Sequence, residues 1–184
     1  DGGHCKSVID IIEQEGQFKV AGIVGTVKSI GSNIFGYKVI GDDSDIEKLS
    51  KIYDYAIVAV GQIQSPEIRI KLFSLLISSG FNLPSIVSPR AYVSSHAAVG
   101  KGSIIMHDAV VNANAVVGDN CIINSKALIE HDSIIHRHCH ISTSVTINGN
   151  VEVGEGSFIG SGAVTNNSIV IKNNSFFKAG ALVK

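Results

Sequence analysis

The chain has 184 residues, of which 45% are hydrophobic, and its formal net charge is -1. That balance excludes the basic footprint of a nucleic-acid-binding protein, and no apolar run reaches the roughly 20 residues that a membrane-spanning helix needs. The three cysteines are an odd number and favour a reducing compartment, so we expect a cytoplasmic protein without disulfides.

The first segment predicts an amphipathic helix behind a glycine loop. Gly2 and Gly3 lead directly into the run HCKSVIDIIEQE. A glycine loop at a helix N-terminus presents backbone N–H groups to an anion such as a phosphate. Such a loop normally follows a strand, so we expect a strand ahead of Gly2 that the printed sequence does not contain. An ordinary flexible start is the plainer alternative.

The next segments alternate strands and helices. FKVAGIVG (18–25) predicts a strand, residues 45–52 predict a helix, and YAIVAVG (55–61) predicts a buried parallel strand. Proline and glycine at the two ends of 66–80 bracket a second long helix. This order predicts a small α/β domain with a Rossmann-like parallel sheet over residues 1–88.

Sheets of this type bind ligands beyond the carboxyl ends of their strands. Gly2, Gly3, His4 and Gly61 fall at that edge, so they are the candidate substrate-binding residues of the first domain.

From Ala91 to Lys184 the sequence divides into blocks of six residues without an insertion, beginning AYVSSH, AAVGKG and SIIMHD. The third place is Val or Ile in every block except those with Thr165 and Phe177, and the last three places collect turn residues. One block cannot bury its own branched side chain and must stack on its neighbours. We therefore predict an all-β parallel β-helix over residues 91–184.

With three blocks in each coil, residues 18 apart would lie on the same face of the β-helix. Cys121 and Cys139 form such a pair, and both occupy the small first place of a block. We interpret them as free thiols that fill the core.

His131 is the candidate general base among the histidines of the repeats. It lies in a turn between Glu130 and Asp132, and adjacent carboxylates can orient an imidazole and raise its basicity. His140 occupies the second place of its block, so its side chain should point outward and contact whatever covers that face.

A zinc enzyme similar to the γ-class carbonic anhydrases is one alternative from another class. His131 and His136 have a suitable spacing, but the third ligand expected two coils earlier falls on Ser95. His96 is one place away and occupies a different turn position, so we expect no bound metal.

The run NSKALIEHDSIIHRHCHISTSVTINGNVEVGEGSFIGSGAV resembles the sialic acid O-acetyltransferase (NeuD) family of hexapeptide-repeat acyltransferases, which includes bacterial UDP-4-amino-sugar N-acetyltransferases of the PglD type. GGHCKSVID resembles the opening loop and helix of that family. The resemblance implies a left-handed β-helix, the hand opposite to that of ordinary parallel crossovers. It also implies a homotrimer that binds acetyl-CoA between adjacent subunits.

The resemblance also implies residue roles. His131 matches the general base, Asp132 the acid beside it, and Asn124 a polar partner that helps to place the histidine. The remaining matches are His140 near the thioester, Gly149 as a backbone donor to the acetyl carbonyl, Gly160 and Ala179 at the coenzyme, and Gly3 and His4 at the sugar nucleotide.

We therefore expect direct acetyl transfer from acetyl-CoA to the amino group of a nucleotide-linked 4-amino-deoxy sugar in bacterial glycan biosynthesis, with His131 as the base. Sialic acid O-acetylation is the alternative, and a non-catalytic scaffold that only binds a sugar nucleotide is another. One departure concerns the nucleotide: Ile23, Val24 and Gly25 stand where many family members have an acidic pair.

Overall fold

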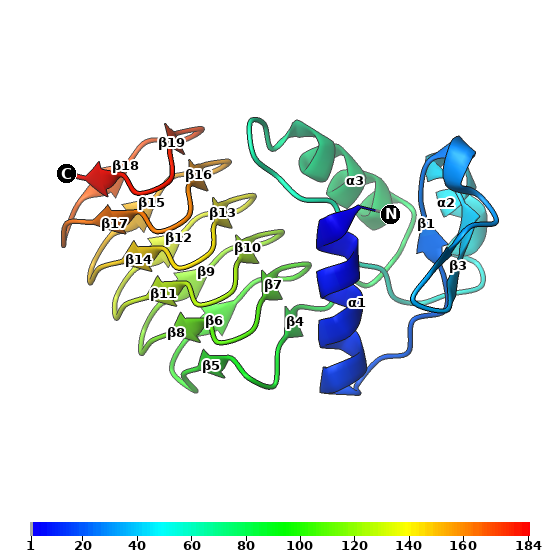
Figure 1. The fold of residues 1–184 in the computed structure, drawn as a ribbon, viewed down its shortest axis with the longest axis horizontal. Coiled ribbons are helices and arrows are strands. Elements are labelled where there is room, and N and C mark those ends of the chain that lie inside the picture. Colours follow the sequence, from blue (N-terminus) through cyan, green and yellow to red (C-terminus); the bar gives the residue numbers. More distant parts are fainter. Residues whose placement is uncertain (1) are drawn as a thin grey trace.

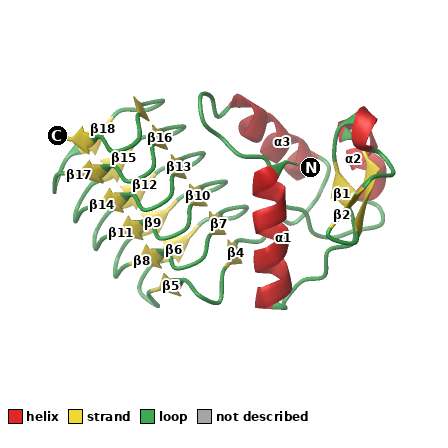
Figure 2. Cartoon of the chain, in the orientation of Figure 1, coloured by secondary structure: helices red, strands yellow, loops and turns green. Residues whose placement is uncertain are grey.

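The computed structural model describes residues 2–184 and consists of a small α/β part beside a stack of parallel coils (Figure 1). Helices occur only in the first part, and the coils consist of short strands joined by turns (Figure 2). The predicted fold class is thus confirmed. Within the described residues, no helix combines the length and the apolar character that crossing a bilayer would require.

Seventeen two-residue strands form the coils, and they pair in three all-parallel sheets. We call these the covered, second and third sheets. The covered sheet contains β4 (Ile86–Val87), β7 (Ile104–Ile105), β10 (Ile122–Ile123), β13 (His140–Ile141), β16 (Phe158–Ile159) and β19 (Phe176–Phe177). The second contains β5 (Tyr92–Val93), β8 (Val110–Val111), β11 (Leu128–Ile129), β14 (Thr146–Ile147), β17 (Val164–Thr165) and β20 (Leu182–Val183). The third contains β6 (Ala98–Val99), β9 (Val116–Val117), β12 (Ile134–Ile135), β15 (Glu152–Val153) and β18 (Val170–Ile171).

The register follows the 18-residue period of the sequence. Ile122, for example, pairs with Ile104 in the coil before it and with His140 in the coil after it. The first coil starts earlier than the predicted boundary at residue 91, because β4 already pairs with β7. The block SIVSPR (85–90) fits the repeat, with Val87 in the third place.

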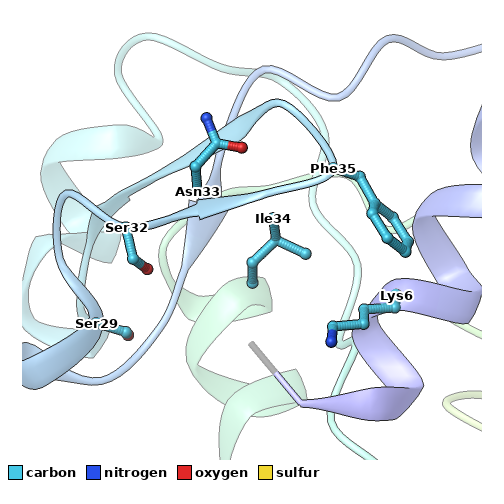
Figure 3. Close-up of a pocket in the computed structure, with 6 residues that line it drawn as sticks. All are labelled: Lys6, Ser29, Ser32, Asn33, Ile34 and Phe35. Carbon is cyan, nitrogen blue, oxygen red and sulfur yellow. The ribbon is translucent and has the colours of Figure 1, made fainter.

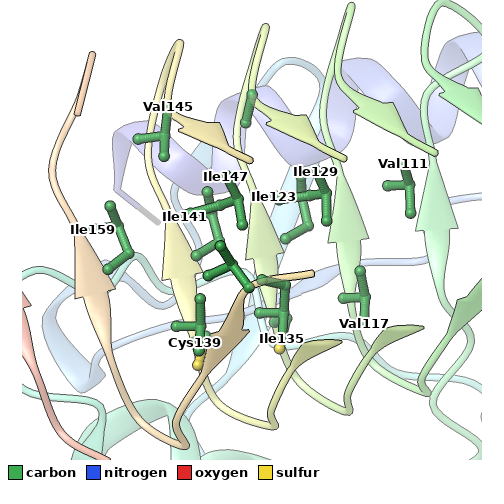
Figure 4. Packing of buried hydrophobic residues seen from close by; sticks show 14 of the residues in the cluster. Val111, Val117, Ile123, Ile129, Ile135, Cys139, Ile141, Val145, Ile147 and Ile159 are labelled. Carbon is green, nitrogen blue, oxygen red and sulfur yellow. The ribbon is translucent and has the colours of Figure 1, made fainter. Parts of the chain in front are cut away.

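The third-place side chains point inward and form the core of the coils. Ile123, Ile129 and Ile135 are fully buried, and their equivalents repeat from coil to coil (Figure 4). Burial of each such side chain stabilises the fold by about 1.5–3 kcal/mol. Cys121 and Cys139 are buried free thiols in this core, as predicted.

The helices and strands of the first part are α1 (Gly3–Glu15), β1 (Ile23–Val24), the 3₁₀ turn Val27–Ser29, β2 (Asn33–Ile34), β3 (Tyr37–Gly41), the 3₁₀ turn Asp43–Asp45, α2 (Ile46–Leu49) and α3 (Glu67–Ser78). The strand order is β1-β3-β2, in which β1 and β3 are parallel and β2 and β3 are antiparallel. The two long helices match the prediction. The sheet is smaller than predicted, because only two residues of 18–25 pair as a strand.

Residues 55–61 make one isolated bridge, between Tyr55 and Asn82, and no longer ladder. The carbonyl oxygens of Val58 and Val60 accept hydrogen bonds from the Arg69 guanidinium, at 3.0 and 2.6 Å. A buried side chain from α3 therefore satisfies groups that a neighbouring strand would otherwise bind.

The first part packs on the outer face of the covered sheet. Val8 and Ile11 of α1 are buried against Ile86 and Ile104. Polar contacts join the same surfaces, because Arg69 Nη2 donates to the side-chain oxygen of Asn120 at 2.7 Å. These contacts hold the helices α1 and α3 beside the coils.

Candidate active site

His131 lies at the corner between the second and third sheets, in the turn that joins β11 to β12. Its side chain is 60% exposed, and its Nδ1 is 2.7 Å from Oδ2 of Asp132. Asp132 has a φ of 63°, a left-handed conformation that Asp tolerates better than most residues. This turn places the carboxylate beside the imidazole.

Two asparagines of the preceding coil hold the carboxylates on either side of His131. Asn114 Nδ2 donates to Asp132 Oδ1 at 2.8 Å, and Asn112 Nδ2 donates to Glu130 Oε2 at 2.8 Å. Neither asparagine was identified from the sequence. Their spacing of 18 residues from the two acids is the pattern that could have found them.

The electrostatics of this corner favour a basic imidazole. The hydrogen bond to Asp132 raises the pKa of His131, and the charges of Asp132 and Glu130 add to this increase, whereas desolvation opposes it. The hydrogen bond from Asn114 lowers the pKa of Asp132, as does its bond to His131. With Asp132 ionised, Nδ1 of His131 carries the proton and donates to the carboxylate, which leaves the Nε2 lone pair free.

Gly149 lies one coil after His131, and the imidazole ring lies over it. A Cβ on Gly149 would be 2.9 Å from both Cε1 and Nε2 of His131, closer than such contacts allow. In the described part of the chain, the Gly149 N–H donates to no other group, whereas its neighbours Asn148 and Asn150 both donate. The candidate base and the candidate N–H donor are therefore adjacent.

His140 points outward from β13, as predicted, and contacts the first part of the chain. Its Nδ1 donates to the Gln62 carbonyl, and its Nε2 accepts from Asn124 Nδ2 at 3.2 Å. Burial lowers the pKa of His140 to about 4, so the ring is neutral at physiological pH. Asn124, expected beside His131, contacts His140 instead.

The two histidines lie on opposite sides of one coil. His140 is on the covered sheet, whereas His131 is at the corner between the other two sheets. In a triangular coil, the corner between the second and third sheets lies opposite the covered sheet. One chain therefore does not bring His131 together with His140 and Asn124.

Gly2, Gly3, His4 and Gly61 do lie together. Gly2 precedes the first residue of α1, and a Cβ on Gly61 would be 3.6 Å from the His4 Cβ. Desolvation lowers the pKa of His4 to about 3, and the charge of Arg69 adds to this effect. Among the described residues, no group hydrogen-bonds to the buried Nε2 of His4.

A hollow opens beside the first turns of α1, under the β2–β3 hairpin (Figure 3). The Lys6 ammonium group and the exposed Phe35 ring both border it. The other lining residues are Ser29, Ser32, Asn33 and Ile34.

Gly160 and Ala179 lie in consecutive turns of the same corner, and their backbones are in close contact without any coenzyme. A Cβ on Gly160 would lie 2.5 Å from the Ala179 backbone nitrogen of the next coil. Glycine therefore allows these two turns to stack closely. Ala179 itself is exposed.

Residues 2–184 contain no cluster of three or more side chains suited to hold a metal ion. His136, the second histidine of the zinc alternative, pairs with Glu152 at 2.8 Å.

Stacked coils of three six-residue blocks, with a histidine–carboxylate pair at one corner, are the features of a hexapeptide-repeat acyltransferase. The family model for the PglD N-terminal domain matches residues 1–76. The acetyltransferase domain of PglB from Neisseria gonorrhoeae FA1090 is 32% identical, with a TM-score of 0.92, over 100% of this chain and 87% of that chain. The chain therefore belongs to the PglD-type family of hexapeptide-repeat sugar acetyltransferases, and it is an acetyltransferase.

Two further structures are informative because they contain ligands. The same PglB domain in complex with acetyl coenzyme A is 31% identical, with a TM-score of 0.88, over 99% of this chain and 88% of that one. PerB from Caulobacter crescentus, in complex with CoA and GDP-perosamine, is 31% identical, with a TM-score of 0.92, over 100% of this chain and 85% of that one. No curated protein matches the chain.

Proposed function

We propose that this protein transfers the acetyl group of acetyl-CoA to the amino group of a nucleotide-linked 4-amino-deoxy sugar in bacterial glycan biosynthesis. The observation that carries the proposal is the arrangement of His131, Asp132 and Gly149, in which the candidate base lies beside an N–H that donates to no other described group. The PerB complex with CoA and GDP-perosamine supports an amino sugar as the acceptor.

In the proposed reaction the acceptor nitrogen attacks the thioester carbonyl while Nε2 of His131 removes its proton. A C–N bond forms, and the carbonyl oxygen becomes an oxyanion that the Gly149 N–H stabilises. Collapse of this intermediate breaks the C–S bond, and His131 returns the proton to the leaving CoA sulfur. Asp132 stabilises the imidazolium that exists between the two steps.

The acceptor nucleotide is proposed to lie along the first turn of α1. The diphosphate would accept hydrogen bonds from the N–H groups that follow Gly2 and would be neutralised by Lys6. The nucleobase of the acceptor would stack on the exposed ring of Phe35. The free Nε2 of His4 would face the sugar.

We further propose that the functional unit is a homotrimer with its sites between subunits. The opposite positions of His131 and His140 in one chain support a site shared by two copies. The third sheet also exposes Val116, Ile134 and Val170 on its outer face, with Glu152 between the last two, a partly apolar surface of the kind that subunit contacts bury. A neighbour packed there would bring the His140–Asn124 pair of one subunit to the His131 of the next.

The test is release of CoA thiol from acetyl-CoA in the presence of UDP- and GDP-linked 4-amino sugars, free sialic acid or no acceptor. We expect turnover only with an amino-sugar nucleotide, and loss of turnover in His131→Ala. His96→Ala is the matched control. His96 is an exposed histidine at the same corner, and only its backbone carbonyl, which alanine keeps, contacts this group, because it accepts from the Asn114 N–H at 3.1 Å.

Near-normal turnover of His131→Ala would refute the assignment of the base. Turnover with sialic acid alone would refute the amine acceptor.

A further inference from the structure

A chain of hydrogen bonds runs across two coils and ends at His131. Asn114 Nδ2 donates to Asp132 Oδ1 at 2.8 Å, and Asp132 Oδ2 is 2.7 Å from His131 Nδ1. Each carboxylate oxygen of Asp132 therefore has its own partner. Holding Oδ1 in place directs Oδ2 at the imidazole.

The exposure of these groups makes that constraint important. The side chains of His131 and Asp132 are 60% and 49% exposed, so surrounding atoms do little to fix either one. A half-exposed carboxylate that lacked a second partner would rotate and exchange its hydrogen bond with water. The Asn114 amide prevents that rotation, because its own backbone is fixed in a turn of the preceding coil.

Other side chains 18 residues apart also pair along the coils, but the described pairs do not end at this base. Asn150 donates to Ser168 at 3.1 Å in the same corner column. Arg90 pairs with Asp108 at another corner. Pairing of corner side chains is thus a general structural feature, and among the described pairs only that of Asn114 and Asp132 continues into the imidazole ring of His131.

We propose that Asn114 is a positioning residue for catalysis, which holds the Asp132 carboxylate so that His131 keeps its proton on Nδ1 and its lone pair on Nε2. This inference rests on the proposed function, in which Nε2 of His131 is the base. Asn112 differs, because its partner Glu130 faces the backbone N–H of His131 at 3.3 Å and not the ring.

Asn114→Gly is the most direct test. Asn114 has a φ of 60°, which glycine adopts without strain, so the substitution removes the amide and leaves the turn intact. Asn150→Gly is the matched control, since Asn150 lies in the same column with a φ of 59°. Asn114→Asp is a second variant of the same shape that cannot donate to Asp132.

We expect kcat to fall about tenfold in Asn114→Gly, the size of effect that follows the loss of a hydrogen bond to a charged group. The KM values for acetyl-CoA and the amino-sugar nucleotide should not change. Asn114→Asp should lose at least as much activity, and Asn150→Gly should match the wild type.

The ¹⁵N NMR shifts of the His131 ring at pH 8 provide a readout that a purely structural role would not alter. The wild type should carry the proton on Nδ1, whereas Asn114→Gly should shift toward the Nε2-protonated tautomer. Unchanged kcat and an unchanged tautomer in folded Asn114→Gly would overturn the inference. Activity of His131→Ala would instead overturn the proposed function, so the two failures are distinguishable.

Discussion

Gly149 determines whether the His131 ring can occupy its observed position. In Gly149→Ala the new Cβ would meet Cε1 and Nε2 of His131 at 2.9 Å, so the ring must move away from Asp132 or tilt out of the corner. We expect kcat to fall at least tenfold, because small displacements of a reacting group have effects of this size or larger. Steady-state kinetics and circular dichroism would test this prediction together.

A double-mutant cycle would separate a steric effect on His131 from a general effect on folding. In the His131→Ala background, Gly149→Ala should cause little further loss, because the ring that it displaces is absent. Fully additive losses would mean that Gly149 acts without His131. Ala113→Gly, which alters the same column on the other side of His131, is expected to keep most of the activity.

The pH dependence of the reaction should show the effect of Asp132 on the pKa of His131. Because Asp132 raises the pKa of His131, the acid limb of kcat/KM should have its midpoint above 6.5, and activity should be lost as the pH falls through it. In Asp132→Asn the raising hydrogen bond and charge are lost. The limb should move to lower pH while the plateau decreases, because the neutral amide no longer fixes the tautomer.

A pH–rate profile of each enzyme with saturating acetyl-CoA would measure both changes. An acid limb that stays in the same place in Asp132→Asn would assign the titrating group to another residue.

At the scale of single residues, local sequence indicated part of the candidate site. His131 and Asp132 are adjacent in the chain, so the Glu-His-Asp turn was enough to predict that they lie together. Asn114 is separated from Asp132 by a full coil and is visible only when the 18-residue register is applied to polar side chains as well as to the core. The contact between His140 and Gln62 spans 78 residues and two parts of the chain, which no local pattern reports.

At the scale of elements, the segment 55–61 depends on the side chain of Arg69. It is 1% exposed and donates to the Val58, Val60 and Asn120 carbonyl oxygens. Burial lowers the pKa of Arg69 to about 10, so it remains charged at neutral pH. Its replacement would leave these carbonyl groups buried and unpaired.

We therefore expect Arg69→Met to lower the free energy of unfolding by about 3 kcal/mol or more, a large value typical of a broken buried network. Urea unfolding would measure it. Arg137→Met is the control, because Arg137 is an exposed arginine whose pair with Glu155 is screened by solvent and should contribute little to stability. Equal losses in both variants would contradict the role of Arg69.

The elements differ in how well their sequences predicted them. The coils follow from one inward aliphatic residue in every block, a pattern that depends on local spacing alone. The helix α3 was equally clear from its proline and glycine ends. The apolar run 55–61 gave the wrong prediction of a continuous strand. Carbonyl oxygens of this run accept hydrogen bonds from the buried Arg69 side chain, and sequence periodicity carries no information about such a donor.

At the scale of the whole molecule, the separation of His131 from His140 leads to a prediction about mixed oligomers. If each site takes His131 from one subunit and His140 from the next, two inactive variants can complement each other. Co-expressed His131→Ala and His140→Ala subunits would form some interfaces that contain both wild-type histidines. Random assembly of equal amounts predicts about a quarter of the wild-type activity, because each of the two positions is correct in half of the cases.

The controls follow from the same geometry. Each variant expressed alone should have little activity, and mixing His131→Ala with the double variant should restore none, since no interface then contains His131. Ile134→Glu should separate the subunits and abolish activity, because it adds a second carboxylate beside Glu152 on the outer face of the third sheet, where the proposed subunit contact lies. Ile52→Glu, an exposed position in the first part, should do neither. If the two variants are each inactive and their mixed trimers show no restored activity, the site is not shared between subunits. If His140→Ala is active on its own, the His140 face has no part in the reaction.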